Sequence, residues 1–345
     1  MKNDMLLWGA LLLAVLLAAW LLTAVLRRYA LAHQVIDIPN KRSSHTMPTP
    51  RGGGVAIVAC FLLSLPVLAM MGWIGWSMAY CIGGAGLVVA LLGFLDDHGH
   101  IAARWRLLGH FAAAAWVLFW MGGLPAFSVF GHMWDMGWFG YVLGALYLVW
   151  VLNLYNFMDG IDGLASVEAI FVAIGGASFY IIAGDTSLAG APVALACAVA
   201  GFLYWNFPPA KIFMGDAGSG FLGVVLGALS LQAAWVEPQL FWSWLILLGV
   251  FIVDASLTLF RRLLRGERVY EAHRSHAYQW AARRFGKHLP VTLSVIGLNL
   301  CWLYPVAWFV AVGKLDGVIG VVIAYVPLAF LAFKLQGGQA EAAAV

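Results

Sequence analysis

Long apolar runs recur along the whole chain, and they constrain its fold more than any other feature. Each run has about 18 or more residues, which is enough for a helix to cross a bilayer core about 30 Å thick. Apolar residues make up 63% of the 345 residues and charged residues 10%, whereas a soluble domain is roughly half apolar and a quarter charged. The sequence therefore predicts an all-α, polytopic membrane protein. A membrane β-barrel is excluded because its short alternating segments are absent.

We expect about eleven transmembrane helices in this chain. The predicted spans are 5–26, 53–71, 75–95, 107–122, 138–153, 164–183, 188–206, 218–235, 239–260, 289–311 and 316–335. They form a single transmembrane domain over 1–336, followed by a tail over 337–345 that we expect to be disordered. The first run exceeds the apolar core of a secretory signal, about 7–15 residues, and ends at Arg27 and Arg28 as a stop-transfer segment does, so we interpret it as a helix.

Positive charge is distributed unevenly between the loops. Sixteen of the nineteen lysines and arginines fall in alternate loops, at 27–52, 96–106, 207–217 and 261–288. By the positive-inside rule these loops are cytoplasmic. The sequence therefore predicts an external N-terminus and a cytoplasmic C-terminus.

Five polar segments interrupt the apolar pattern, and all of them fall on the predicted cytoplasmic side. They are "DIPNKRSSHTMPTPRGGG" (37–54), "GFLDDHGH" (93–100), "NLYNFMDGIDGLA" (153–165), "NFPPAKIFMGDAGSG" (206–220) and "AHRSHAYQ" (272–279). Their location on one membrane face predicts that they build one site.

Five aspartates stand at predicted helix ends with few lysines nearby: Asp96, Asp97, Asp159, Asp162 and Asp216. Crowded carboxylates repel one another and stay partly protonated unless a cation lies among them. A magnesium ion, held by one or two carboxylates and by substrate phosphates, would satisfy this need. Solvated acids at helix ends are the alternative. Asp96 and Asp97 would point about 100° apart on a helix, which predicts different roles for the two.

The segment from 153 to 163 combines a three-residue spacing with two glycines. A helical end to the fifth span would align Asn153, Asn156 and Asp159 on one face, and Gly160 and Gly163 permit a tight turn beside a ligand. A helix cap followed by a turn is the alternative, although a cap needs only one such residue. In "GDAGSG", backbone N–H groups at a helix start could bind an anion, but ordinary turn chemistry explains this segment as well.

Two histidines and one intramembrane acid complete the candidate residues. His273 and His276 lie three residues apart among arginines, a pattern suited to phosphate contact or proton transfer and equally to a structural role. No third nearby ligand indicates zinc. Asp254, near the cytoplasmic end of the ninth span, indicates either a function or a buried bond to a neighbouring helix or Arg261.

The five segments, in this order and at these spacings, resemble the polyprenyl-phosphate N-acetylhexosamine-1-phosphate transferase family, which includes phospho-N-acetylmuramoyl-pentapeptide transferase and the undecaprenyl-phosphate GlcNAc-1-phosphate transferases. The resemblance covers about 37–280 and rests on the Asp96–Asp97 pair, the Asn153 to Gly163 stretch and Phe213 to Ser219. The first segment is more similar to the GlcNAc-1-phosphate branch. One departure is the histidine motif, which commonly reads His-x-His-His in the family and here has Arg274 and Ser275 between its histidines; this indicates a subgroup with altered sugar recognition.

The resemblance implies that undecaprenyl phosphate attacks a UDP-N-acetylhexosamine and releases UMP, at the cytoplasmic face of the bacterial inner membrane, to start a surface glycan such as O-antigen. It implies Mg²⁺ or Mn²⁺ on Asp216 and Asn156. Asp96 and Asp97 would lie near the attacking phosphate, Asp159 and Asp162 on the nucleotide side, and His276 against the diphosphate. The expected substrate-binding residues are Asn153, Arg42, His45, Arg51, Phe213, His273 and Arg274.

Two other classes of protein compete with this interpretation. An ion-coupled transporter also needs intramembrane acids, but would place them near the middle of the bilayer, often within internal repeats. A membrane scaffold without activity would tolerate loss of the acid set, which is intact. The expected partners are the two substrates and membrane lipids. Nucleic acid is not expected, and the sequence leaves a homodimer open.

Overall fold

The computed structural model describes residues 2–39, 44–45, 47–99, 101–267 and 273–340, and these residues are mainly helical. The α-helices are α1 (Lys2–Ala32), α2 (Gly54–Met70), α3 (Trp76–Gly99), α4 (Ala103–Met121), α5 (Phe139–Phe157), α6 (Leu164–Ile182), α7 (Gly190–Asn206), α8 (Asp216–Val236), α9 (Pro238–Leu247), α10 (Gly249–Leu264), α11 (Ala277–Phe285), α12 (Leu289–Leu298), α13 (Tyr304–Ala311) and α14 (Gly317–Lys334). A 3₁₀ turn, η1 (Thr186–Ala189), precedes α7, and a π-helical turn, η2 (Asn299–Leu303), joins α12 to α13.

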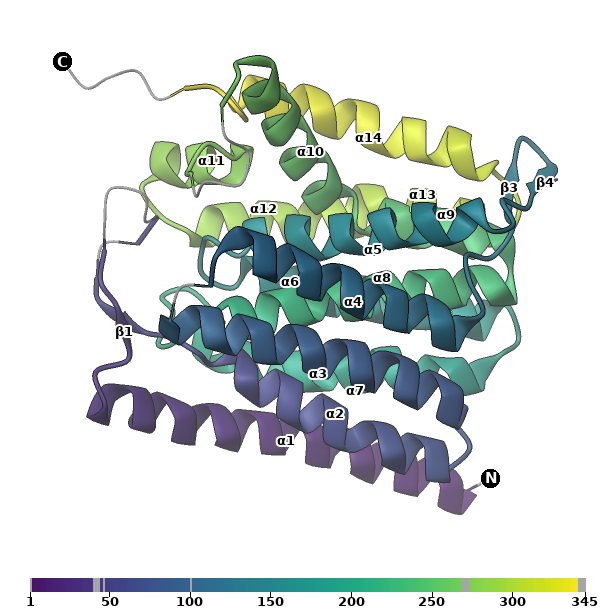
Figure 1. Ribbon diagram of the computed structural model, residues 1–345, viewed down its shortest axis with the longest axis horizontal. Coiled ribbons are helices and arrows are strands. Elements are labelled where there is room, and N and C mark those ends of the chain that lie inside the picture. Colours follow the sequence, from purple (N-terminus) through teal and green to yellow (C-terminus); the bar gives the residue numbers. More distant parts are fainter. Residues whose placement is uncertain (1, 40–43, 46, 100, 268–272, 341–345) are drawn as a thin grey trace.

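Two small antiparallel hairpins complete the described elements. Strand β1 (Ile36–Asp37) pairs with β2 (Thr49–Pro50), with Ile36 opposite Pro50. Strand β3 (Phe127–Val129) pairs with β4 (His132–Trp134). The first hairpin lies at the same end of the bundle as α11, and the second lies at the opposite end (Figure 1).

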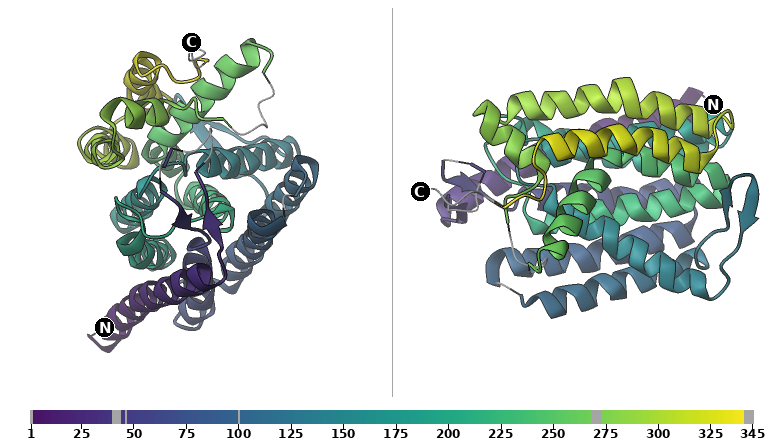
Figure 2. Two further views of the ribbon diagram at one scale, coloured as in Figure 1. Left: turned by 90° about the vertical axis from the view of Figure 1, so that its left-hand side faces the viewer. Right: turned by 90° about the horizontal axis from the view of Figure 1, so that it is seen from above.

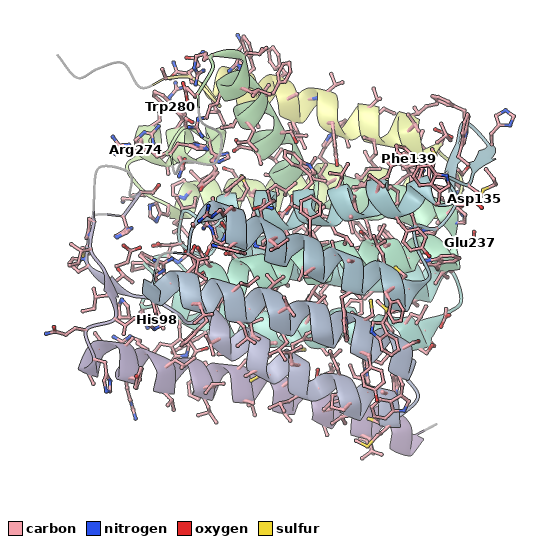
Figure 3. The ribbon with its side chains drawn as sticks, viewed as in Figure 1. His98, Asp135, Phe139, Glu237, Arg274 and Trp280 are labelled. Atoms are coloured by element: carbon pink, nitrogen blue, oxygen red, sulfur yellow. The ribbon has the colours of Figure 1, made fainter. Side chains whose placement is uncertain are left out.

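Most of the helices run alongside one another, so their loops gather at two ends of the molecule (Figure 1). Seen end-on, α1 lies at one edge of the bundle and α12 to α14 lie at the opposite edge (Figure 2). Side chains from the two loop faces are far apart. His98, Arg274 and Trp280 lie at one end, and Asp135, Phe139 and Glu237 lie at the other (Figure 3).

Helix α8 is the centre of the bundle. It packs against α2, α3, α5 and α9, and nearly all of its residues are buried. Small residues permit this: a Cβ placed on Gly223 would lie 2.7 Å from the Cα of Leu152 on α5. Close backbone approach at small residues is how helices associate inside a membrane, where burial of apolar surface supplies little driving force.

The all-α, polytopic architecture is confirmed, but the count of eleven spans is not. Each predicted span coincides with a helix or a consecutive helix pair. Among the described residues, however, eight helices are long and apolar enough to cross a membrane, or up to nine if a bent pair is one span. Helix α2 has only 17 residues, and α4 is outside the eight because Arg104, Arg106 and His110 make its first turns polar.

The ninth predicted span, 239–260, is not a straight helix. Helices α9 and α10 meet at an angle of 70°, which makes this segment a broken span or a re-entrant loop. The sequence could not indicate this bend, because the apolar pattern continues through Leu248 and Gly249 without a proline.

The chain after α14 turns back onto the cytoplasmic loops predicted from the positive charges. The backbone N–H of Gly338 donates to the carbonyl of Ser275 at 2.6 Å, and Arg261 donates to the carbonyl of Gly337 at 2.6 Å. Gly338 of the predicted tail is therefore in contact with the histidine segment and Gly337 with α10, and 341–345 lie outside the described residues.

The two loop ends make the orientation testable. A topology reporter fused after Gly131, in the β3–β4 hairpin, should be external, and one fused after Gly286, at the end of α11, should be cytoplasmic, because the basic loops lie at the α11 end. Alkaline phosphatase and fluorescent-protein fusions report the two sides. The reverse result at both positions would overturn the predicted orientation.

Candidate active site

The central contact of the polar end joins α3 to α8. Near the end of α3, the carboxylate of Asp97 accepts the backbone N–H of Asp216 at 3.1 Å and that of Ala217 at 3.4 Å. Gly215, just before α8, has a φ of +79°, and a Cβ there would lie 2.7 Å from the Asp97 carboxylate. Only glycine suits both the conformation and the space. A carboxylate at the amino end of a helix is stabilised by its free N–H groups and by its dipole.

Arg51 bridges two of the aspartates. Its guanidinium forms an ion pair with Asp97 and lies 3.5 Å from Asp216 Oδ1. Backbone hydrogen bonds hold its segment in place: Phe213 N donates to Pro50 O at 2.8 Å, and Gly53 N donates to Phe213 O at 2.9 Å. Burial lowers the pKa of Arg51, but Asp97 and Asp216 outweigh it and raise the pKa above its usual value. Arg51 is therefore a fixed cation.

Asp96 and Asp97 have different partners. Asp96 accepts the backbone N–H of Ile101 at 2.7 Å and pairs with Arg106 of α4 at 2.5 Å. Arg106 also lies 3.9 Å from Asp216 Oδ2. The predicted divergence of the two neighbouring acids is thus confirmed in their contacts. Arg106 is a site residue that the sequence analysis did not single out, because it stood among loop arginines that also set topology.

The two asparagines of α5, Asn153 and Asn156, lie on the same side of the bundle as Asp96 and Asp216 and line a cavity with them. Asn156 Nδ2 donates to Asp216 Oδ1 at 3.2 Å and to Ser219 Oγ at 2.9 Å. Asn153, one turn earlier, donates to the carbonyl of Val149 at 2.7 Å and lies 3.4 Å from His110 of α4. Of the three residues predicted to align on a helix, the two asparagines do so and line one cavity, whereas Asp159 does not, because α5 ends at Phe157.

Asp159 comes after the end of α5, in the turn that leads to α6. Burial raises its pKa well above the ordinary value, the Asp216 carboxylate adds to this, and Arg51 opposes it. Four carboxylates, those of Asp96, Asp97, Asp159 and Asp216, thus gather around two guanidinium groups, those of Arg51 and Arg106. When all are ionised, two negative charges remain uncompensated.

A cavity of about 500 Å³ opens beside this cluster, between α3, α4, α5 and α8. Its polar lining includes Asp96, Arg104, Arg106, Asn153, Asn156 and Asp216. The remaining lining is largely apolar and includes Val89, Leu92, Leu107 and Leu152. We call this the lipid-side cavity, because polar groups beside apolar helix surface suit an amphiphile with an anionic head.

A second cavity, of about 550 Å³, is lined by Phe213, three residues before Asp216. Its lining includes His45, Asp162, Phe213, Arg283, Lys287 and His288. The ring of His45 packs edge-on against Phe213 with centroids 4.8 Å apart. Ser44 Oγ and His45 Nε2 are buried without a hydrogen-bond partner among the described residues. A pocket with an aromatic ring, cations and unused polar atoms suits a planar anionic ligand. We call it the basic cavity.

The histidine segment is packed behind these cavities. His276 is only 2% exposed, stacks on His273 at 4.7 Å, and lines neither cavity. Burial lowers the pKa of His273 to about 3, with His276 and Arg262 adding to the effect, and its Nδ1 lies 2.9 Å from Ser275 Oγ. Contact of His276 with a diphosphate stays a prediction, as does a substrate role for Arg274, whose carbonyl accepts from Arg283 at 2.9 Å.

Asp254 holds this segment in place. Its two oxygens accept the backbone N–H groups of Ala277 and Tyr278 at 2.9 Å each, and His276 Nδ1 lies 3.4 Å from the carboxylate. Asp254 therefore caps the amino end of α11 from α10. Of the two alternatives that the sequence left open for this acid, these contacts favour the buried bond to a neighbouring helix.

The predicted site residues thus divide into three groups. Asp96, Asp97, Asp159, Asp216, Asn153, Asn156 and Arg51 gather at the α3–α8 junction; Asp162, Phe213 and His45 line the basic cavity; His273, Arg274 and His276 form the packed segment behind them. Arg42 lies outside the described residues. His288 was missed, because a single histidine between a lysine and a leucine carries no motif.

Comparison with known proteins agrees with the resemblance found in the sequence. The family model described as glycosyl transferase family 4 matches residues 78–234. A Bacillus subtilis protein named as a probable undecaprenyl-phosphate N-acetylglucosaminyl 1-phosphate transferase is 31% identical over 76% of this chain and 74% of its own length. This chain belongs to the polyprenyl-phosphate N-acetylhexosamine-1-phosphate transferase family.

Two further relatives represent other members of this family. A decaprenyl-phosphate N-acetylglucosaminephosphotransferase of Mycobacterium tuberculosis is 30% identical over 79% of this chain and 75% of its own length. A phospho-N-acetylmuramoyl-pentapeptide-transferase of Moorella thermoacetica is 35% identical over 53% of this chain and 61% of its own length. The matched segment 78–234 contains the Asp96–Asp97 pair, the asparagines of α5 and the start of α8.

The cap on α11 can be tested by stability. Asp254→Ala removes the acceptor for two buried N–H groups and should destabilise the protein by about 1–3 kcal/mol, seen as a lower melting temperature in detergent. Asp254→Asn retains one acceptor oxygen and should lose less. Asp135→Ala, which removes an exposed carboxylate in the loop after β4, is the control. An unchanged melting temperature for Asp254→Ala would contradict the capping role.

Proposed function

We propose that this protein transfers an N-acetylhexosamine 1-phosphate from a UDP-sugar to undecaprenyl phosphate and releases UMP. The observation that carries the proposal is that the short segment 213–216 contributes a residue to each of the two cavities. Phe213 lines the basic cavity, and Asp216 lines the lipid-side cavity three residues later. A nucleotide from the cytosol and a phosphate from the bilayer would meet across this segment. Family membership supports the same reaction.

The chemistry requires one bond to form and one to break. An oxygen of the lipid phosphate attacks the sugar-bearing phosphorus of the UDP-sugar, and the bond between that phosphorus and the oxygen bridging to the uridine phosphate breaks. The products are a lipid-diphosphate sugar and UMP. Such transfers depend on positioning and on neutralising the phosphate charge. Arg51 and Arg106, which flank Asp216, would supply fixed positive charge on the protein side.

The side chains of Asp96, Asp97 and Asp216 differ in solvent exposure, and this difference indicates different roles. The side chain of Asp97 is only 4% exposed and that of Asp96 is 11% exposed, whereas that of Asp216 is 29% exposed. Asp97 is already engaged by Arg51 and by two N–H groups of α8. We therefore propose that Asp97 acts by positioning Arg51 and the start of α8. A role as general base is not needed, because a phosphate near neutral pH is already largely ionised.

We further propose that Asp216 and Asn156 hold Mg²⁺, with Mn²⁺ as a substitute. Their carboxylate and amide oxygens are ligands of the kind that Mg²⁺ prefers, and phosphates and water fill its other positions. The two uncompensated negative charges at the junction fit a dication. Among the described residues no three acidic or histidine side chains form a metal cluster alone, which suits an ion shared with a substrate. When bound, such an ion would neutralise charge on the transferred phosphate.

The nucleotide is assigned to the basic cavity, with Phe213 against the base and Asp162 on the sugar side. We propose a UDP-N-acetylhexosamine as donor and a lipid-linked surface glycan such as O-antigen as the product pathway. The active site would face the cytoplasm of a bacterial inner membrane, in keeping with the basic loops. An ion-coupled transporter is disfavoured, since the acid cluster is at one end of the helices.

The reaction can be tested directly. The purified protein, incubated with Mg²⁺, undecaprenyl phosphate and a panel of UDP-sugars, should release UMP with at least one UDP-N-acetylhexosamine. Excess chelator should stop the release, and added Mg²⁺ or Mn²⁺ should restore it. Absence of UMP with every sugar would overturn the proposed function, and full activity in chelator would remove the metal from it.

A magnesium titration separates the two acidic roles. Asp216→Asn should lower turnover by about a hundredfold or more, equal to about 2.7 kcal/mol, and should raise the Mg²⁺ concentration needed for half-maximal rate. Asp97→Asn should lower turnover but leave that concentration nearly unchanged. The matched control is Asp135→Asn in the external loop. A raised requirement in Asp97→Asn with an unchanged one in Asp216→Asn would reverse the assignment.

A further inference from the structure

His288 connects two segments that are far apart in the sequence. It stands just before α12, and its ring lies between the loop before α2 and the turn before α6. Nε2 lies 3.0 Å from the backbone carbonyl of Ser44, and Nδ1 lies 3.0 Å from Asp162 Oδ1. All three residues line the basic cavity. The ring therefore ties two walls of that cavity together.

The same turn of α12 also holds the backbone of Asp162. Thr292 Oγ1, four residues after His288, donates to the carbonyl of Asp162 at 2.9 Å. The second carboxylate oxygen of Asp162 accepts the backbone N–H of Ala210 at 3.0 Å. The side chains of Asp162 and His288 are 12% and 15% exposed. Both oxygens of the Asp162 carboxylate therefore have a partner. His288 connects this carboxylate to the wall of the basic cavity that contains Ser44.

The partners of the ring indicate its protonation. The Ser44 carbonyl and the Asp162 carboxylate are both acceptors, so the ring satisfies both when each nitrogen carries a proton. Nδ1 also lies 3.3 Å from the backbone nitrogen of Asp162, which a neutral ring would accept instead of donating to the carboxylate. Burial lowers the pKa of His288, but the hydrogen bond and charge of Asp162 outweigh it and raise the pKa above the usual value.

Loss of the proton would therefore remove one of the two hydrogen bonds that the ring donates. A neutral ring has one N–H: with the proton on Nε2 it keeps the bond to Ser44, and Nδ1 then accepts the backbone N–H of Asp162 instead of donating to the carboxylate. Other charged and titratable groups on the same cavity are His45 before α2, Arg283 of α11 and Lys287 before α12. The two cations oppose the charge on the ring, and Asp162 favours it.

We propose that His288 is a positioning residue for the nucleotide-sugar: in its charged form it sets the distance between the Ser44–His45 wall and the Asp162 wall of the basic cavity. The proposal rests on the proposed function of that cavity. Ser44 Oγ and His45 Nε2 are buried in the first wall without a hydrogen-bond partner among the described residues. They can form hydrogen bonds with a ligand only when this wall is held at the right distance. A preformed cavity binds more tightly, because its ordering cost is already met.

Three substitutions at His288 separate the two bonds. His288→Ala removes both and should raise KM for the UDP-sugar by about tenfold, with kcat changed less than about threefold and KM for undecaprenyl phosphate unchanged. His288→Asn keeps a donor toward Asp162, and His288→Gln keeps one toward Ser44, so each should raise KM less. Ser294→Ala, on the exposed side of α12, is the control and should match the parent.

The pH profile is a second measurement that a merely structural residue would not move. In the parent, KM for the UDP-sugar should rise as pH increases through the raised pKa of His288, above the ordinary histidine value of about 6.5. In His288→Asn, which has no proton to lose there, this rise should be absent. An unchanged KM in His288→Ala, or the same pH profile in His288→Asn, would overturn the proposal.

Backbone hydrogen exchange gives a test that does not depend on the reaction. The amides of Met47 and Thr49 should exchange faster in His288→Ala than in the parent, whether or not UMP is formed. If the parent makes no UMP but exchange accelerates, the proposed function fails and the link between the walls remains. If the parent is active and neither KM nor exchange changes in His288→Ala, only the role of His288 fails.

Discussion

The carboxylate of Asp97 accepts the first backbone N–H groups of α8 and pairs with Arg51, so three parts of the chain meet on one side chain. Helix α8 is the most enclosed helix, and α2, α3 and α5 pack around it. The free N–H groups at the amino end of α8 need hydrogen-bond acceptors, and at the membrane surface water does not surround them on every side. The acid that accepts these N–H groups also fixes Asp216 through its backbone N–H and Arg51 through an ion pair.

Placing the site at helix ends has an electrostatic consequence. Carboxylates from the ends of α3, α5 and α8 converge, and the protein supplies fewer guanidinium groups than carboxylates at this point. The junction therefore carries net negative charge when its acids are ionised. A divalent cation that also binds substrate phosphates would compensate this charge. Folding alone does not favour this crowding, since each carboxylate raises the pKa of its neighbours. Such a cluster is the kind of strained feature that persists when binding requires it.

A line of polar contacts between α6 and the α12–α13 segment holds the other side of the site. It begins with His288 and Thr292 on Asp162 and continues into the membrane with Asn299, which donates to the buried Glu168 at 2.6 Å. Further along, Ser178 and Tyr304 lie 3.0 Å apart. The π-helical turn at Asn299–Leu303 adds a residue to one turn, which lets both Asn299 and Tyr304 face α6. Polar pairs between helices fix their register where apolar packing alone would allow sliding.

The sequence by itself determined the membrane class, the helical fold and the gathering of five polar segments at one face, because apolar length, charge bias and motif spacing are local properties of the chain. It also determined that Asp96 and Asp97 diverge and that Asn153 and Asn156 align, since helical geometry dictates both. Only the tertiary structure decided the bend between α9 and α10, the capping of α11 by Asp254, and the burial of His276 behind the cavities. It also decided that Arg106 lines the lipid-side cavity and His288 the basic cavity. These features depend on contacts between residues from 10 to more than 240 positions apart, and no local pattern in the chain encodes such contacts.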